Sequence, residues 1–265
     1  MSSGAGAPRI DIVIPTLNEA HVLEKSVQTL RSFCAEHMKA YAWKVVVADN
    51  GSSDGTDTIA RRLEQAHSDV GAVLLRERGR GRALRTAWAA SDADILSYMD
   101  VDLSTELAAL PRVADAIARE GFEVSIGSRL MRGARIERSF KREFISRSYN
   151  HLIRLLLRTR FSDAQCGFKA VSRRVVREIV PLIEDQGWFF DTELLVLSER
   201  LGYPIKDVPV LWIEDHDSRV KIVSTALDDI RGLLRLRRTL PGIASRRSAA
   251  AAAGGAERLQ EPPQP

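Results

Sequence analysis

The first 130 residues alternate between short apolar strands and helical patterns, and this alternation leaves few folds open. Apolar runs rich in β-branched residues stand at 10–15, 44–49, 71–77, 93–100 and 123–127. Between them, helical spacing of apolar residues covers 22–30, a stretch from a cap at Asp54 through Leu63, 82–90 and 105–119. Near-continuous apolar strands joined by helices are typical of a parallel sheet covered on both faces. We therefore predict an α/β fold with a mostly parallel central sheet.

The second half of the chain has a different pattern. Helices are expected at 142–158, 188–202 and 222–240, with a strand at 205–213. The first and last of these helices each combine an apolar side with an arginine side, formed by Arg147, Arg154 and Arg158 in one and by Arg231, Arg235 and Arg238 in the other. Basic amphipathic helices of this kind lie in a membrane interface or pack on the domain core, and the sequence leaves both alternatives open.

Charge is distributed unevenly along the chain. The net charge is +4, but residues 129–160 carry +8 and residues 219–247 carry +6, which leaves −10 for the rest. Two basic segments on an acidic body suggest an anionic partner, such as phosphates or an anionic membrane surface, or else simply solvated helix faces. Nucleic acid is not expected, because the remainder is acidic and aromatic residues do not alternate with Lys and Arg.

The chain has no features of a secreted or membrane-spanning protein. The first nine residues lack an apolar core of a signal peptide, and no run approaches the roughly 18 apolar residues of a spanning helix. Its two cysteines, Cys34 and Cys166, form no CxxC pair, which favours a reducing cytosol and argues against a zinc site. From Ser245 the chain becomes rich in Ala, Gly and Pro, so 245–265 is predicted to be a disordered tail, and 1–8 a flexible N-terminus.

Polar side chains gather where the predicted strands end, the usual location of ligand sites in open α/β sheets. These clusters are PTLNE (15–19), DNGSSDGT (49–56), DVD (100–102) and GSR (127–129). Asp100 and Asp102 stand two apart at the predicted end of a strand, so we expect both side chains to point to the same side. Mg²⁺ is commonly held by one or two carboxylates together with substrate phosphate oxygens. A lone DxD occurs often by chance. Together with Ser104 it superficially matches the DxDxT of haloacid-dehalogenase phosphatases, but that motif usually ends the first strand of its domain, and here it ends the fourth.

Taken together and in order, these motifs resemble glycosyltransferase family 2, which has the Rossmann-like GT-A nucleotide-sugar-binding fold. The segments are PTLNE, ADNGSSDGT (48–56), GRGRAL (79–84), DVD and GSR. DAQCGFKAVSR (163–173), WFFDTELL (188–195) and VPVLWIE (208–214) narrow the likeness to the dolichyl-phosphate β-glucosyltransferase branch and bacterial polyprenyl-phosphate relatives. RSFKREFISRSYN (138–150) resembles a stretch of dolichyl-phosphate mannose synthases. The family commonly has lysine where Arg80 stands and two acids where Asp49 and Asn50 stand.

The resemblance implies a role for each matching position. The nucleotide-sugar donor would be bound by Pro15, Thr16, Glu19, Asp49, Gly51, Ser52, Arg80, Asp100, Val101, Asp102, Gln165 and Lys169. Asp100 and Asp102 would hold Mg²⁺ or Mn²⁺. The acceptor phosphate would be bound by Arg129, Arg142, Ser146 and Arg219, and the catalytic residues would be Asp102, Asp191 and Glu193.

The activity implied is inverting transfer of a hexose from a nucleotide-diphosphate sugar to a polyprenyl or dolichyl phosphate. Glucose and a UDP donor are favoured, while mannose from GDP-mannose, an N-acetylhexosamine donor, or a soluble phosphorylated acceptor remain alternatives. One domain is expected over 9–240, with a nucleotide-binding half (9–130) and an acceptor-binding half (131–240). Because a polyprenyl tail stays in the bilayer, we expect a cytoplasmic protein peripherally associated with the cytoplasmic face of a membrane.

Overall fold

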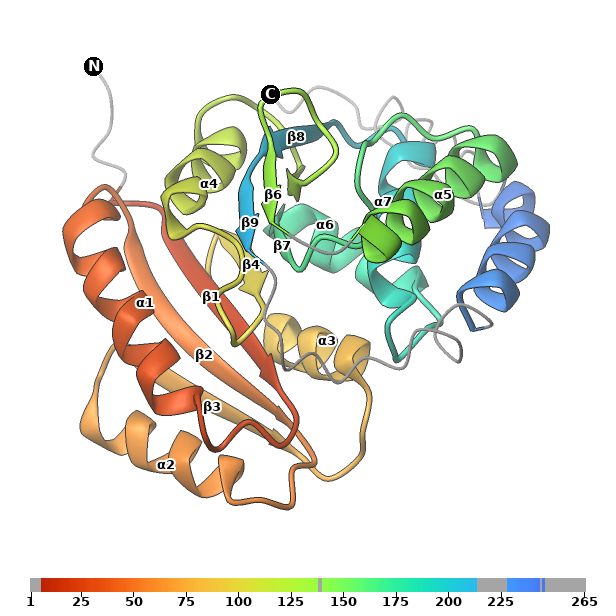
Figure 1. Cartoon of the computed structure of the whole chain (residues 1–265). Helices are drawn as coiled ribbons and strands as arrows, with labels where there is room; N and C mark the ends of the chain where they lie inside the picture. Colours follow the sequence, from red (N-terminus) through yellow and green to blue (C-terminus); the bar gives the residue numbers. More distant parts are fainter. Residues whose placement is uncertain (1–5, 138–139, 214–227, 244, 246–265) are drawn as a thin grey trace, which may run out of the picture.

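The computed structural model describes residues 6–137, 140–213, 228–243 and 245, with the main chain alone at 137 and 140–142. Figure 1 shows the elements in chain order. They are β1 (Arg9–Thr16), α1 (Leu23–His37), β2 (Ala42–Asn50), α2 (Thr56–Ala66), β3 (Val70–Leu75), α3 (Arg80–Ala90), β4 (Ile95–Met99), a 3₁₀ turn (Leu107–Ala109), α4 (Leu110–Ala118), β5 (Val124–Ser128), β6 (Arg135–Glu137), α5 (Phe140–Leu157), β7 (Phe168–Ser172), α6 (Arg173–Glu178), a 3₁₀ turn (Val180–Leu182), α7 (Phe190–Arg200), β8 (Ile205–Pro209) and β9 (Leu211–Ile213). Residues 228–243 are helical as well.

The central sheet is mostly parallel, which confirms the predicted fold class. Its strand order is β3-β2-β1-β4-β7-β5-β8, and a small second sheet pairs β6 with β9. Strand β7 runs antiparallel to both of its neighbours, β4 and β5. Strand β7 was not predicted, and it begins inside the QCGFK segment, which was expected only to form part of a binding site. This strand carries Lys169 into the middle of the sheet.

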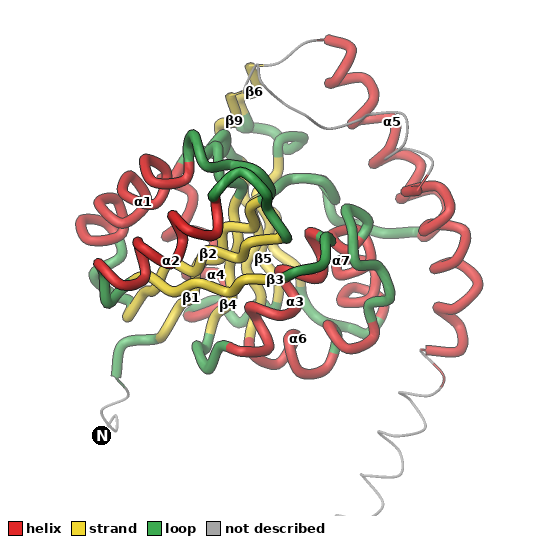
Figure 2. The backbone as a smooth tube through the Cα atoms, turned by 90° about the horizontal axis from the view of Figure 1, so that it is seen from below, coloured by secondary structure: helices red, strands yellow, loops and turns green. Residues whose placement is uncertain are grey.

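Helices cover both faces of the sheet. Successive apolar residues of a strand point to opposite faces, so each face forms a core with its own helices. On one face Ile10, Ile12 and Ile14 pack against α1, α2 and α4. On the other face Val13 belongs to a core that includes side chains of α3, α5, α6 and α7. Figure 2 shows α3 and α6 on the side of the sheet opposite α1 and α2. The amphipathic helices take part in this second core through Ile153 and Leu157 of α5 and through Leu233 and Leu236 of the segment 228–243.

Two predicted elements were wrong in their extent. The helix expected over 105–119 is a 3₁₀ turn followed by α4, which begins only at Leu110 with a proline in its first turn. The strand expected over 205–213 is divided after Pro209 into β8, in the central sheet, and β9, in the small sheet. Of the helix expected over 222–240, residues 222–227 lie outside the described residues.

The carboxyl ends of β1, β2 and β4 meet at one edge of the sheet because these three strands are adjacent and parallel. The polar clusters predicted from the sequence therefore lie close together. Among the helices that the structure describes, none combines the length and the apolar character needed to cross a bilayer.

Candidate active site

The loops that follow β1 and β2 are bound to each other by hydrogen bonds. The amide of Asn18 donates to Ser52 Oγ (2.8 Å), and the amide of Ser53 donates to Asn18 Oδ1 (2.8 Å). The amide of Glu19 donates to Thr56 Oγ1 (2.9 Å). Six predicted donor-site residues are thereby gathered at one edge of the sheet: Pro15, Thr16, Glu19, Asp49, Gly51 and Ser52.

Two buried oxygen atoms in this region have no hydrogen-bond partner. Thr16 and Asp49 are partners across β1 and β2, and both side chains are buried. Asp49 Oδ2 accepts the amide of Ser52 (3.1 Å), but Asp49 Oδ1 and Thr16 Oγ1 are left without a partner within the protein. A buried polar atom without a hydrogen-bond partner costs about 1–3 kcal/mol. Two such atoms on neighbouring residues at the edge of the sheet therefore indicate a place for a ligand with hydrogen-bonding groups.

Arg80 links the predicted donor site to α7. Its Nη2 donates to Asp100 Oδ1 (2.6 Å) and its Nη1 donates to Asp191 Oδ2 (2.7 Å). The guanidinium also lies over the rings of Tyr98 (5.0 Å) and Trp188 (4.8 Å). Burial works against the charge of Arg80, but the two carboxylates outweigh it and raise its pKa. Arg80 is therefore a fixed cation that faces two predicted site residues at once.

Asp191 is held on its other side by a buried polar network. Tyr98 donates its hydroxyl to Asp191 Oδ1, and Lys169 Nζ donates to Tyr98 Oη (3.0 Å) and to the carbonyl of Cys166 (2.6 Å). Burial, together with the negative charge of Asp191, raises the pKa of Tyr98. Both carboxylate oxygens of Asp191 are therefore occupied by donors from α3 and β4.

Asp100 and Asp102 lie beyond the end of β4, in a turn, so the expectation that strand geometry aims both to one side does not apply. Asp100 contacts Arg80, whereas Asp102 is exposed and accepts the amide of Ser104 at Oδ1 (3.0 Å). Val101 between them is buried in the core. Gly167 abuts Asp100 so closely that a Cβ there would fall 1.7 Å from Asp100 Oδ2. Only glycine at 167 leaves room for this carboxylate.

This pair of carboxylates fits a divalent cation that takes its remaining ligands from a diphosphate. Carboxylate oxygens are the hard ligands that Mg²⁺ and Mn²⁺ prefer, and one or two of them suffice when substrate phosphates complete the shell. No cluster of three or more His, Cys, Asp or Glu ligands occurs in the part of the chain that the structure describes.

The predicted acceptor residues are only partly placed. Arg129 is buried, and its Nε and Nη2 donate to the two oxygens of Asp163 (2.8 and 3.0 Å). Ser146 is buried on α5 with its Oγ unpartnered. The side chain of Arg142, and Arg219 as a whole, lie outside the described residues. Asp163, which the sequence analysis missed, anchors Arg129 and leaves its Nη1 as the nitrogen not engaged in that pair.

The remaining predicted residues point in different directions from α7 and the QCGFK segment. Two residues apart on a helix means about 200° of rotation, so Glu193 faces away from Asp191. Glu193 Oε2 accepts the amide of Asp185 (3.0 Å) and Nη2 of Arg235 (2.7 Å), and burial raises its pKa against these contacts. Gln165 Nε2 donates to Asp229 Oδ2 (3.2 Å). The structure therefore brings Asp191 to Arg80 and Asp100, and places Glu193 and Gln165 beside the segment 228–243.

Tyr98, Asp163, Gly167 and Asp229 were not identified from the sequence. A signal existed for Tyr98, which lies near the end of β4 and stands two residues before Asp100. Asp163 stands two residues before Gln165 in a segment already singled out. Asp229 had no such signal, because its neighbours come from α5 and from the loop before β7.

Asp229 predicts a pH dependence of stability. Burial raises its pKa to about 7, with the charges of Asp185, Asp228 and Asp191 adding to the shift and a hydrogen bond with Tyr149 opposing it. A raised carboxyl pKa means that the native state binds the proton more tightly than the unfolded state does. The protonated Asp229 therefore adds to the free energy of unfolding below about pH 4, and this contribution is lost as the pH rises to about 7. We therefore compare the Tm of Asp229→Asn with that of the wild type at two pH values. The Tm of the variant minus that of the wild type is expected to be larger by several degrees at about pH 8 than at about pH 5, since about 1 kcal/mol corresponds to roughly 2–4 °C.

The measurement is thermal unfolding followed by circular dichroism in matched buffers. Glu193 and Asp207 also have raised pKa values, but they are present in both proteins and cancel in the comparison. A Tm difference that stays constant between the two pH values would contradict the shifted titration of Asp229.

Comparison with known proteins identifies the family. The profile of glycosyl transferase family 2 matches residues 11–180, more than half of the chain. The chain therefore belongs to glycosyltransferase family 2, as the order of its motifs had indicated.

Its relatives include two glycosyltransferases of different length. The glycosyltransferase AglD of Haloferax volcanii is 35% identical over 224 residues, which are 84% of this chain and 36% of AglD. The dolichyl-phosphate β-glucosyltransferase of Dictyostelium discoideum is 28% identical over 247 residues, 88% of this chain and 76% of that protein. The chain thus spans only about a third of AglD. These relatives confirm the resemblance to the dolichyl-phosphate β-glucosyltransferase branch.

Solved structures confirm the GT-A fold. The glucosyl-3-phosphoglycerate synthase of Mycobacterium tuberculosis in complex with UDP superposes with a TM-score of 0.66 at 22% identity, covering 89% of this chain and 86% of that one. The same enzyme with Mn²⁺, UDP and phosphoglyceric acid gives a TM-score of 0.67 at 19% identity, covering 87% and 78%. At these identities the likeness establishes the fold alone.

Proposed function

We propose that this protein transfers a hexose, glucose in the first place, from a UDP-sugar to a polyprenyl or dolichyl phosphate with inversion at the anomeric carbon. One edge of the sheet carries the proposal. The unpartnered oxygens of Thr16 and Asp49 lie there at the ends of β1 and β2, and Asp100 and Asp102 follow the neighbouring strand β4. The names of the relatives supply the acceptor, because several are dolichyl-phosphate β-glucosyltransferases at 25–28% identity.

The donor would lie along this edge. Thr16 Oγ1 and Asp49 Oδ1 would hydrogen-bond the base and ribose, satisfying atoms that otherwise lack partners. Asp100 and Asp102 would hold Mg²⁺ or Mn²⁺, and this cation, when bound, acts as a Lewis acid that neutralises the charge of the departing diphosphate. Arg80, fixed between Asp100 and Asp191, would add a second positive charge near the leaving group.

The acceptor chemistry explains why the site needs cations more than a general base. A lipid phosphate is already an anion at neutral pH, so no proton has to be removed before its oxygen attacks the anomeric carbon. Such a reaction does not require Asp191 to act as a general base, and both of its oxygens already accept hydrogen bonds, from Arg80 and Tyr98. Arg129, Arg142, Ser146 and Arg219 are proposed to hold the acceptor phosphate, because guanidinium groups bind phosphate in a bidentate manner.

The proposal is tested with purified protein, a panel of radiolabelled sugar nucleotides and Mg²⁺ or Mn²⁺. Acceptors are polyprenyl phosphate, dolichyl phosphate and 3-phosphoglycerate. We expect label to enter the organic phase from UDP-glucose, in an acid-labile glycosyl phosphate whose anomeric linkage is β by nuclear magnetic resonance of the intact product. Label that appears only with the soluble acceptor, or retention of the α configuration, would overturn the proposal.

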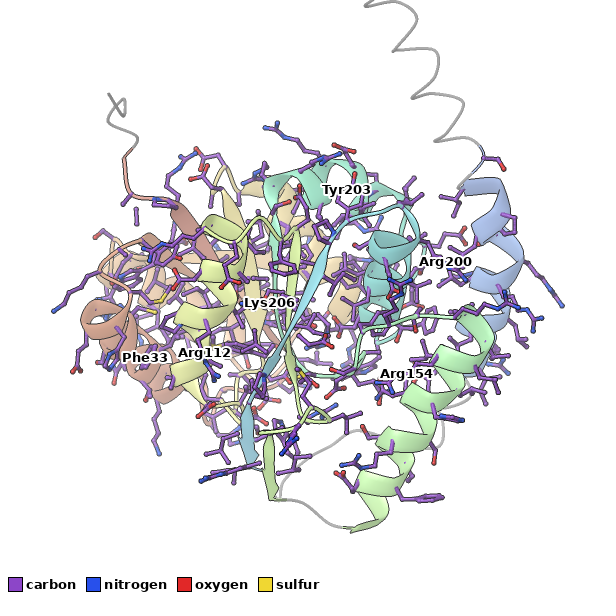
Figure 3. The ribbon with its side chains drawn as sticks, turned by 90° about the horizontal axis from the view of Figure 1, so that it is seen from above. Phe33, Arg112, Arg154, Arg200, Tyr203 and Lys206 are labelled. Atoms are coloured by element: carbon purple, nitrogen blue, oxygen red, sulfur yellow. The ribbon has the colours of Figure 1, made fainter. Side chains whose placement is uncertain are left out.

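We also propose that the protein docks on the cytoplasmic face of an anionic membrane through α5 and the segment 228–243, which lie at the same end of the molecule (Figure 3). These helices expose Phe144 and Leu155, and Ile230 and Leu234, beside arginines. Arg154, labelled in Figure 3, is partly used within the fold, because its Nη2 donates to the carbonyl of Ser162 (3.1 Å). Basic residues near an anionic leaflet contribute about 1 kcal/mol each.

Vesicle flotation tests this docking surface. Leu155→Ser and Phe144→Ser are each expected to lower binding to vesicles containing phosphatidylglycerol by about tenfold, since each removes a large exposed apolar side chain. The control is Phe33→Ser on α1, at the opposite end of the molecule in Figure 3. Because Phe33 is partly buried on the core, the fold of this variant is first verified by circular dichroism. Wild-type binding that ignores both anionic lipid and salt, or an equal loss in the control, would contradict the assignment.

A further inference from the structure

A cavity of about 460 Å³ lies between the loop before α7 and the helical segment 228–243. Its size falls within the range of about 300–1,000 Å³ typical of small-molecule sites. Three carboxylates, two arginines and two aromatic side chains contribute to its lining, which comprises Asp185, Gly187, Trp188, Phe189, Asp228, Asp229, Arg231, Gly232 and Arg235. No role in the proposed reaction has been assigned to this cavity so far.

The cavity adjoins the candidate active site through the loop 185–189. The amide of Gly81 donates to the carbonyl of Gly187 (3.2 Å), and the amide of Arg82 donates to that of Gln186 (3.1 Å), so this loop lies against the start of α3. Trp188, which lines the cavity, has Arg80 over its ring. Since Arg80 contacts Asp100, one indole ring separates the cavity from the guanidinium that pairs with the predicted metal ligand.

The helical wall of the cavity is fixed against two motifs of the active site. Arg235 donates to Glu193 of the FDTELL segment, and Asp229 accepts from Gln165 of the QCGFK segment. Gly232 packs on the ring of Phe189 so closely that a Cβ would lie 2.5 Å from it. The wall therefore has a defined position relative to the donor site, although it lies beyond residues 11–180, which the family profile matches.

The charges that line the cavity favour a neutral, polyhydroxylated occupant. Arg231 pairs with Asp228 (3.1 Å), and Arg235 pairs with Glu193 (2.7 Å), so neither guanidinium is an uncompensated cation for a phosphate. Asp185 and Asp229 add negative charge, which disfavours an anion further. An isoprenoid chain would leave these polar groups without water, at a cost. Carboxylates and guanidinium groups beside an exposed indole suit the hydroxyls and the apolar face of a sugar ring.

We propose that this cavity binds the hexose ring of the sugar-nucleotide donor, with Trp188 and Asp229 as the residues that recognise the sugar. This inference rests on the proposed function, because it takes the donor to be a sugar nucleotide lying on Asp100. Trp188 is half exposed at 50%, as expected of an aromatic side chain that a ligand covers. Asp229 is buried at the base of the segment and hydrogen-bonds Gln165, so it also orients that amide.

The test separates recognition of the sugar from recognition of the nucleotide. Binding of UDP and of UDP-glucose is measured by isothermal titration calorimetry at about pH 7.5 with Mg²⁺, for the wild type, Asp229→Asn and Trp188→Leu. We expect the ratio of the Kd for UDP-glucose to the Kd for UDP to rise by about tenfold in each variant, the size of one lost sugar contact. The ratio cancels any effect on the nucleotide that the two ligands share, including a disturbance of Arg80.

Asp207→Asn is the matched control, since burial raises the pKa of Asp207 as it does that of Asp229, but Asp207 lies on β8 and accepts the amide of Ser162 (2.9 Å). Its ratio is expected to stay within about twofold of the wild type. Wild-type binding of UDP-glucose with unchanged ratios in both variants would overturn the hexose subsite alone. Absence of UDP-sugar binding by the folded wild type would overturn the proposed function, and the subsite with it.

Discussion

Asp102→Asn is expected to lower kcat for sugar transfer by on the order of a thousandfold, because it removes a proposed charged ligand of the cation that would stabilise the departing diphosphate. Asp102 is exposed, and its Oδ1 accepts one backbone amide, so the substitution leaves the core untouched. The unfolding transition should therefore stay close to that of the wild type. Steady-state kinetics at saturating metal measure the effect.

Asp69→Asn is the control for this prediction. Asp69 precedes β3 at the other end of the strands and pairs with Arg31 (2.9 Å), so it should retain wild-type turnover. Turnover of Asp102→Asn within about tenfold of the wild type would remove Asp102 from the metal site, since loss of a transition-state contact of this kind normally costs more.

Arg80→Met is expected to lower the free energy of unfolding by about 3–5 kcal/mol and to abolish transfer. The substitution leaves the buried Asp191 with Lys169, 3.5 Å from its Oδ1, as its remaining cationic partner, so the cost of breaking one side of this buried ion pair lies toward the lower end of that range. The pair with Asp100 adds little to stability, because that carboxylate is 42% exposed and is screened by water. Urea denaturation followed by circular dichroism gives the free energy.

Arg80→Lys separates charge from geometry at this position. A lysine ammonium is a point charge that reaches one carboxylate well, whereas the guanidinium bridges Asp100 and Asp191 at 2.6 and 2.7 Å. We therefore expect Arg80→Lys to lose less stability than Arg80→Met and to retain measurable transfer. If Arg80→Met unfolds within about 1 kcal/mol of the wild type, the bridge does not stabilise the fold as described.

The parallel part of the fold could be predicted because its strands are apolar on both faces. Runs such as IDIVIP and KVVVAD have few alternatives once helical patterns separate them. Strand β7 could not be predicted in the same way, because it is short and carries Lys169, whose charge is usually at the surface. Lys169 is tolerated there because its Nζ pairs with Asp191 Oδ1 (3.5 Å) and donates hydrogen bonds to Tyr98 Oη and the carbonyl of Cys166.

The candidate site divides along the same line. Residues at the ends of strands, such as Thr16, Asp49 and Asp100, follow from the rule that ligands bind at the carboxyl edge of a parallel sheet. Their partners do not follow from any local rule, because Arg80 meets Asp191 across 111 positions and Arg129 meets Asp163 across 34. The bounds of α5 were predicted closely from its apolar spacing. The contact between Gln165 and the segment 228–243 could not be predicted, because it depends on how the helices pack.

The most direct test of the central claim is electron paramagnetic resonance of Mn²⁺, whose free-ion signal falls when the ion is bound. With UDP-glucose present, the wild-type protein is expected to remove about one equivalent of Mn²⁺ from the free pool, because Asp100 and Asp102 complete its ligands only together with the diphosphate. Asp102→Asn should leave the signal near that of Mn²⁺ with UDP-glucose alone. Equal binding by both proteins, or none by the folded wild type, would contradict the account.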